Sequence, residues 1–475
     1  MKCRWLMGVL LCCSLSLSAK VTFPTVLADN MVLQQNEKVN LWGKATPNKV
    51  VKITPSWSNV EYKVTADQAG KWLVKVQTPA AGGPYEIKFN DGETVTLKNI
   101  LIGEVWFCSG QSNMEMPMRG FGGQPVEGAL DYVIKAKKST PIRMYTTVNK
   151  ISKTPMDDVP GTWKEHDPEG VSSCSATAYF FARYLQEVLE VPIGLVISNW
   201  GGSSVEAWMS REAMNDFKDE FDLSYLDNDK ASGKNDNQTP CYLYNAKLHP
   251  LINYTIKGAI WYQGESNAGN PEQYTRLFPA FVKDIRKSFK QGDFPFYYVQ
   301  IAPYAYGKEN EVGSALLRES QLKCMDLIPN SGMAVTMDTG QIYIIHPRKK
   351  KEAGERLAYW ALAKTYNIPG IPCESPVYDS FAVEDGKAVV SFKTKHGLCT
   401  HSTWQVGNVE IAGEDKVFHE ATAYIRGNKL YAECKEVPNP VALRYGFKNY
   451  TEATLFNDYD IPVSSFRTDN WLYYK

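Results

Sequence analysis

Four residues in the middle of the sequence offer the groups that acyl transfer requires, namely Ser112, Gly202, Gln263 and His346. A serine hydroxyl is a weak nucleophile until a neighbouring base takes its proton, and histidine is the side chain best suited to do so near neutral pH. We therefore predict that Ser112 is a nucleophile and that His346 is its general base. This chemistry requires the two residues to meet in one cleft.

The sequence also predicts donors for the oxyanion that forms when a nucleophile attacks an ester carbonyl. Glycine has no side chain to block an approaching group, so the backbone N–H of Gly202 can donate a hydrogen bond to the oxyanion. The side-chain amide of Gln263 and the backbone N–H of Ser112 can supply two more. Taken one at a time, these residues also fit a tight turn or a polar strand end, and only their combination favours catalysis.

Pro347 follows the predicted base directly, and proline is favoured at the first position of a helix. We therefore expect His346 to lie at a helix start, where the helix dipole disfavours the imidazolium and keeps the ring neutral. The other histidines lie in predicted loops or β regions without comparable neighbours: His166, His249, His396, His401 and His419.

Each of the four residues comes shortly after a predicted strand. In chain order these strands cover residues 100–108, 193–198, 256–262 and 333–337. Ligands bind beyond the carboxyl ends of the strands in an open α/β sheet, so we expect the four loops to open at one end of one sheet. Helical patterns at 178–189, 274–289 and 348–366 alternate with the strands, which predicts a parallel sheet with helices on both faces.

Changes of pattern along the chain predict four regions. Residues 1–20 have a basic start and a short apolar run, which is typical of a signal peptide and predicts a secreted or periplasmic protein. Residues 21–98 have the alternation and turns of a β-sandwich-like module, and residues 99–368 form the predicted α/β domain. Residues 369–475 are β-rich again, and either form a domain of their own or pack with the N-terminal module.

The composition argues against several other classes of protein. Lys and Arg together number 52, as do Asp and Glu, so zero net charge gives no electrostatic case for binding nucleic acid or an anionic membrane. After the leader, the sequence has no segment apolar enough for a transmembrane helix. The 10 cysteines include no C-x-x-C pair, so we expect no metal and no cofactor. The oligomeric state stays open.

Four motifs resemble the blocks of SGNH hydrolases, in the branch that contains sialate O-acetylesterases and acetylxylan-type esterases. Residues 110–114 (GQSNM) resemble the nucleophile block, 200–208 (WGGSSVEAW) the glycine block, 261–267 (WYQGESN) the Gln-Gly-Glu block, and 346–348 (HPR) the histidine block. Residues 27–34 (LADNMVLQ) are also similar to the start of sialate O-acetylesterases. The likeness runs from about residue 22 to the C-terminus.

This resemblance implies a flavodoxin-like three-layer α/β/α SGNH-hydrolase core, with accessory β-sandwich regions at both ends. It also implies metal-free hydrolysis of O-acetyl esters on sialic acid. In that reaction Ser112 carries an acetyl-enzyme, His346 moves the proton, and Gly202 and Gln263 form the oxyanion hole.

One position departs from the family pattern. The family usually places an aspartate two residues before the histidine, where this chain has Ile344. That carboxylate fixes the histidine tautomer, and its loss in serine hydrolases costs on the order of 10⁴ in rate. Asp338, at the end of the preceding strand, or Glu265 can take its place. The remaining alternative is that the protein has lost most of its activity.

We therefore predict a serine esterase that removes O-acetyl groups from sialic acid. Because the shape of the pocket selects the sugar, acetylxylan or another acetylated carbohydrate is the alternative substrate. The alternative of a different class, motivated by Ile344, is a carbohydrate-binding protein on a catalytically impaired esterase scaffold. In the enzyme readings the binding partner is an O-acetylated sugar.

Overall fold

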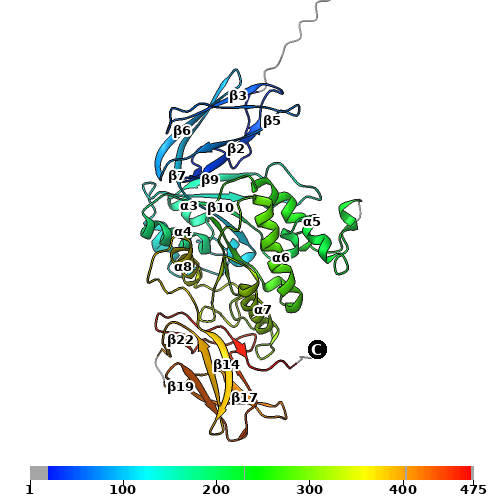
Figure 1. Ribbon diagram of the computed structural model, residues 1–475, viewed down its shortest axis with the longest axis vertical. Coiled ribbons are helices and arrows are strands. Elements are labelled where there is room, and N and C mark those ends of the chain that lie inside the picture. The colour runs from blue at the N-terminus through cyan, green and yellow to red at the C-terminus, as the bar shows by residue number, and fades with distance from the viewer. Residues whose placement is uncertain (1–19, 229–230, 402–403, 472–475) are drawn as a thin grey trace, which may run out of the picture.

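The computed structural model describes residues 20–228, 231–401 and 404–471. Figure 1 shows three regions along the long axis: a blue β module, a mixed α/β part from cyan to olive, and an orange and red β region. Of the predicted signal peptide, residues 1–19 lie outside the described residues.

The two β regions lie at opposite ends of the long axis (Figure 1), so the C-terminal region does not pack with the N-terminal module. Its polar contacts go to the α/β part instead. Ser314 N–H donates to Asn449 Oδ1 at 2.8 Å, and Gln300 Nε2 donates to Ser464 Oγ at 2.8 Å. The structure therefore contradicts the alternative in which residues 369–475 pack with the N-terminal module.

A parallel sheet forms the centre of the α/β part. Its strands are, in spatial order, β13 (Ser331–Ala334), β12 (Phe296–Val299), β11 (Gly258–Tyr262), β7 (Thr94–Gly110), β10 (Ile193–Asn199) and β8 (Ile142–Thr147), with β9 (Gly161–Glu165) antiparallel at the edge. When β8 is set aside and the other five parallel strands are numbered by chain order, the strands from β10 to β13 lie in the order 2-1-3-4-5, as in a doubly wound, flavodoxin-like sheet. The predicted crevice therefore lies beyond the carboxyl end of β7.

Helices cover both faces of this sheet, because both faces are apolar. Trp106 faces α4 (Ala176–Leu189) and packs on Phe181 with the ring centroids 4.9 Å apart. Its neighbour Phe107 faces the other way and packs on Phe289 of α6 (Pro271–Phe289), at 5.7 Å. The helix α8 (Lys350–Trp360) lies on the first face, and α7 (Gly313–Leu327) lies on the second.

The N-terminal module and the α/β part share one strand. The first part of β7 pairs with β6 (Gly82–Asn90), and its later residues pair with β10 and β11. Of residues 94–99 at the start of β7 only Leu97 is buried, whereas burial is continuous from Ile100 onward. The predicted boundary between residues 98 and 99 thus falls inside a strand, where one face of the sheet changes from exposed to covered.

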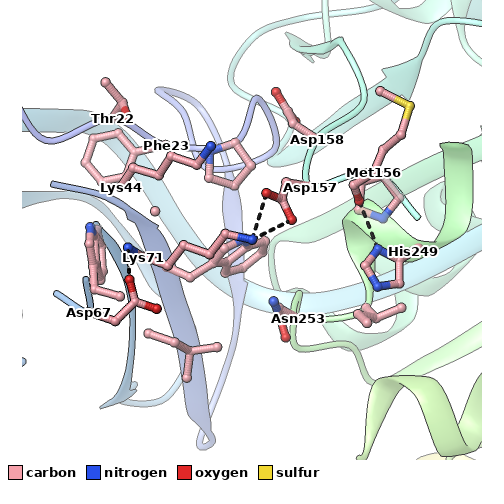
Figure 2. A pocket seen from close by; sticks show the side chains of 17 residues that line it. Thr22, Phe23, Lys44, Asp67, Lys71, Met156, Asp157, Asp158, His249 and Asn253 are labelled. Atoms are coloured by element: carbon pink, nitrogen blue, oxygen red, sulfur yellow. Dashed lines mark hydrogen bonds and ion pairs between the residues drawn. The ribbon is translucent and has the colours of Figure 1, made fainter. Parts of the chain in front are cut away.

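A cavity of about 530 Å³ lies where the N-terminal module meets the α/β part. Figure 2 shows Lys71 of the module directed at Asp157, with Nζ 3.1 Å from Oδ1. On the same side as Asp157, His249 Nδ1 lies 2.9 Å from the carbonyl oxygen of Met156, which accords with a structural role for this histidine. The lining residues do not include Ser112, so this cavity is not the predicted active site.

Within the described ranges, no helix is long and apolar enough to cross a membrane. Those same residues contain no group of three or more His, Cys, Asp or Glu side chains arranged to hold a metal ion.

Candidate active site

Ser112 lies at the sharp turn between β7 and the short helix α1 (Ser112–Glu115). The turn requires glycine at position 110, because φ of Gly110 is +144° and a Cβ there would lie 2.1 Å from the carbonyl oxygen of Tyr262. Ser112 itself remains partly exposed, whereas Gln111 and Asn113 on either side are buried. The serine is therefore displayed at the end of the central strand.

Asn113 connects the serine turn to the histidine loop. Its Nδ2 donates to the carbonyl oxygen of Ile345 at 3.1 Å, although the two residues are 232 positions apart in the chain. One residue of this hydrogen-bonded pair follows Ser112 and the other precedes His346. The structure therefore brings the two predicted catalytic loops together at the carboxyl end of the sheet.

The turn that contains Gly201 and Gly202, called the glycine turn below, packs against Ser112. A Cβ on Gly201 would lie 3.4 Å from Ser112 Cβ, so the turn passes directly over the nucleophile. The N–H of Gly201 donates to Glu115 Oε2 at 2.5 Å and is not free. Gly202 follows with φ of +70°, and its N–H has no hydrogen-bond acceptor among the described residues. Of the two glycines, Gly202 is the one with a donor available to a ligand.

Gln263 is fully buried behind this turn. Its Nε2 donates to the carbonyl oxygen of Ser203 at 3.2 Å and to Asn267 Oδ1 at 2.7 Å, and its Oε1 accepts from the Tyr274 hydroxyl at 3.2 Å. The amide thus holds the glycine turn in place. It could reach an oxyanion only by exchanging one of these two donated bonds.

His346 lies in a loop and not at a helix start, because α8 begins at Lys350. The expected helix dipole is therefore not what keeps the ring neutral. Burial and the positive charge of Lys350 lower the pKa of His346 to about 4, with burial the larger cause. The ring is accordingly a neutral proton acceptor at ordinary pH.

The hydrogen-bond partner of the histidine ring is Gln124, which the sequence did not single out. His346 Nδ1 lies 2.6 Å from Gln124 Oε1, and the ring of Phe121 packs on the imidazole in a T-shaped contact at 5.2 Å. The only sequence signal is the glycine-rich turn between Phe121 and Gln124, which carries no chemistry by itself.

The two carboxylates predicted to orient the ring have other partners. Asp338 accepts two hydrogen bonds from Arg356, at 2.6 and 2.7 Å. Glu265 Oε1 accepts from Asn113 Nδ2 at 2.5 Å, and burial raises the pKa of Glu265. Among the described residues, neither carboxylate is hydrogen-bonded to His346.

A buried polar cluster supports Asn113 from below. Lys350 Nζ lies 2.5 Å from Asn113 Oδ1 and 5.5 Å from the centroid of the Tyr262 ring. Burial lowers the pKa of Lys350, and the nearby Glu265 opposes this shift. Because Asn113 is bonded at both ends of its amide, the serine turn and the histidine loop are held in one arrangement.

A family model described as "Carbohydrate esterase, sialic acid-specific acetylesterase" matches residues 102–362 of the chain. The chain belongs to this family of carbohydrate esterases. The matched residues contain all four predicted catalytic loops, from Ser112 to His346.

Relatives of known activity and structure agree with this membership. The chain is 29% identical to the sialate O-acetylesterase of Homo sapiens over 398 residues, covering 75% of this chain and 73% of that protein. It is 28% identical to the sialate O-acetylesterase of Mus musculus over 412 residues, covering 75% of each. The crystal structure of a carbohydrate acetylesterase from Xanthomonas citri matches with 34% identity and a TM-score of 0.86, covering 95% of this chain and 100% of that chain.

In this esterase the described geometry has the parts that ester hydrolysis needs. A partly exposed hydroxyl stands at the end of the central strand, a neutral imidazole lies on the neighbouring loop, and the Gly202 N–H has no hydrogen-bond acceptor in the part of the chain that the structure describes. None of the surrounding groups is a metal-binding cluster within the described ranges.

Proposed function

We propose that this esterase is a sialate O-acetylesterase in which Ser112 is the nucleophile and His346 is the general base. The observation that carries the proposal is the hydrogen bond from Asn113 to the carbonyl of Ile345, which holds the two loops side by side. The mammalian relatives with that activity support the choice of sugar. The 2-1-3-4-5 strand order supports our assignment of the core to the SGNH hydrolases.

In the proposed reaction Ser112 Oγ attacks the acetyl carbonyl carbon while the Nε2 atom of His346 takes the hydroxyl proton. The N–H groups of Gly202 and Ser112 donate to the oxyanion of the tetrahedral intermediate. The intermediate collapses, the bond between the acetyl carbon and the sugar oxygen breaks, and His346 returns the proton to that oxygen. The acetyl group is then an ester on Ser112.

Water completes the cycle. It attacks the acetyl-enzyme, His346 takes a proton from the water, and acetic acid leaves as that proton passes to Ser112 Oγ; the acid then ionises to acetate in solution. Gln263 would complete the oxyanion hole by exchanging a bond with Ser203 or Asn267, and otherwise fixes the glycine turn.

Acetylxylan or another acetylated carbohydrate is the second candidate substrate, and the structural similarity to a carbohydrate acetylesterase of Xanthomonas citri favours it. We also propose that residues 1–20 form a signal peptide and that the esterase is secreted or periplasmic. The basic start and short apolar run of that segment support this.

Acetate release from 9-O-acetyl sialic acid and from acetylated xylo-oligosaccharides tests the proposed function. We expect the higher kcat/KM on the sialic acid, and we expect Ser112→Ala to lower kcat by at least about 10⁴-fold because it removes the nucleophile. Ser380→Ala, at an exposed serine of the C-terminal region, is the matched control and should behave as wild type. Equal turnover by wild type and Ser112→Ala would remove the enzyme mechanism, and a preference for xylan would favour the second substrate.

A further inference from the structure

We propose that Gln124 is the positioning residue for His346, so that a neutral amide oxygen takes the place of the carboxylate that usually orients such a histidine. This inference rests on the proposed function, because it concerns the base of the same reaction. The chain has Ile344 at the position where the family pattern places an aspartate, and the structure fills the orienting role from a different loop.

The hydrogen bond to Gln124 determines which ring nitrogen carries the proton. The two atoms, His346 Nδ1 and Gln124 Oε1, are 2.6 Å apart. An amide oxygen only accepts hydrogen bonds, so the imidazole nitrogen that faces it must be the one with the proton. The lone pair is then on Nε2, the nitrogen that a general base needs.

The loop that carries Gln124 is built as a closed turn. The backbone groups of Phe121 and Gln124 bond to each other in both directions, at 3.1 and 3.0 Å. Gly123 has φ of +73° within this turn, a conformation that glycine adopts without strain. A Cβ on Gly120 would lie 2.3 Å from the carbonyl oxygen of Gln124, so the chain is closely packed on itself here. Gln124 is therefore presented by a well-defined element.

The packing of the ring agrees with this role. Phe121, from the same turn, contacts the face or edge of the imidazole at 5.2 Å between centroids. One short turn thus supplies both the hydrogen bond and an apolar contact to His346. Such a pair of contacts restricts both the tilt and the rotation of the ring, as an orienting element must.

A neutral orienting group has a different electrostatic effect from a carboxylate. An aspartate fixes the tautomer and also stabilises the imidazolium, whereas an amide does only the first. The charged groups near the ring are Lys350 from α8, Glu265 behind Asn113, and the exposed Arg348, which is paired with Glu127 at 3.9 Å. Burial and Lys350 lower the pKa of His346 to about 4. Because the neutral ring is the active form, activity should persist until the pH falls to that region.

The pH dependence of kcat/KM for p-nitrophenyl acetate tests the inference, with Gln124→Glu and Gln124→Met as variants. Gln124→Glu places a negative charge beside the Nδ1–H group, which stabilises the imidazolium. The substitution should therefore raise the pH of the acid limb by about 1–3 units. Gln124→Met keeps the volume but removes the acceptor, and should lower kcat/KM about tenfold at pH 7. If Gln124 only filled space and did not contact the ring, the acid limb of Gln124→Glu would lie at the same pH as that of wild type.

Gln341→Glu is the matched control, because it adds the same charge on the turn next to His346. Gln341 Oε1 accepts from the N–H of Arg348 at 3.1 Å and has no hydrogen bond to the ring. Its partly exposed charge should move the acid limb by less than about half a unit, since solvent and salt screen it. Thermal melting of each variant separates a change in the base from a loss of the fold.

Nitrogen-15 NMR of protein with labelled histidine shows which ring nitrogen carries the proton, and this measurement does not depend on enzyme activity. We expect the neutral His346 ring in wild type to carry its proton on Nδ1. A proton on Nε2, or an acid limb that is identical in wild type and Gln124→Glu, would overturn the inference. If instead Ser112→Ala kept full activity while NMR showed the Nδ1 proton, the proposed function would fail and the positioning of the ring would stand.

Discussion

At the scale of single residues, the site depends on a few positions where no other side chain fits. Gly110 allows β7 to turn abruptly, because a Cβ would lie 2.1 Å from the carbonyl oxygen of Tyr262. Asn113 then ties the turn to the histidine loop at Ile345. The chemistry of Ser112 is therefore set by neighbours that take no part in bond breaking.

Gly110→Ala should destabilise the protein and remove its activity. The added methyl group must displace the backbone of Tyr262, and the alanine must adopt φ of +144°. We therefore expect the free energy of unfolding to fall by about 2–4 kcal/mol. Urea unfolding followed by tryptophan fluorescence measures this loss. Gly269→Ala is the control, because a Cβ there meets nothing within 4 Å. Equal unfolding midpoints for the two variants would contradict the packing described.

The residue that orients His346 could not be predicted from the sequence. Sequence spacing pointed to Asp338 and Glu265, which lie near the expected strand ends. Arg356 binds the first, and Asn113 binds the second. Gln124 is 222 positions away from His346 and stands in a loop whose composition resembles any glycine turn. Only the folded chain shows that its amide meets the ring.

At the scale of elements, apolar periodicity predicted α4, α6 and the central strands, because each buries a regular apolar face. It did not predict α7, whose inward side carries polar residues such as Arg318 and Gln321. It also placed the start of the last helix at residue 348, because Pro347 resembles a helix start, whereas α8 begins at Lys350.

Arg318 shows what α7 does with its polar face. Its side chain is fully buried, where Nε donates to Ser465 Oγ at 3.0 Å and Nη2 donates to the carbonyl oxygen of Lys448. Burial lowers the pKa of this guanidinium to about 10, so it remains protonated at neutral pH. The arginine therefore joins the C-terminal region to the α/β part through buried hydrogen bonds.

Arg318→Met should weaken that connection strongly. The substitution keeps much of the apolar stem but leaves several buried acceptors without a donor, and we expect a loss of about 2–5 kcal/mol in the free energy of unfolding. Urea unfolding and limited proteolysis near residue 370 measure the effect. The exposed pair of Arg211 and Asp227 provides a control, since Arg211→Met should change stability far less. No change on Arg318→Met would show that the contact is not important.

At the scale of the whole molecule, the two accessory regions are attached in different ways. The N-terminal module shares β7 and one apolar core with the α/β part, so Phe89 and Phe278 belong to the same cluster. The C-terminal region has its own core around Ile411 and Leu430 and joins the rest through polar contacts. The order of the three regions was predictable from sequence. Their attachment was not, because it depends on contacts between distant segments.

The labelling of Ser112 by a p-nitrophenyl phosphonate tests the central claim most directly, since the reagent needs an activated serine but no particular sugar. We expect mass spectrometry to find one modified peptide, containing Ser112, and we expect His346→Ala to slow the labelling by at least about 100-fold because it removes the general base. Labelling of a different residue, or an equal rate in wild type and His346→Ala, would contradict the claim that these two residues act together.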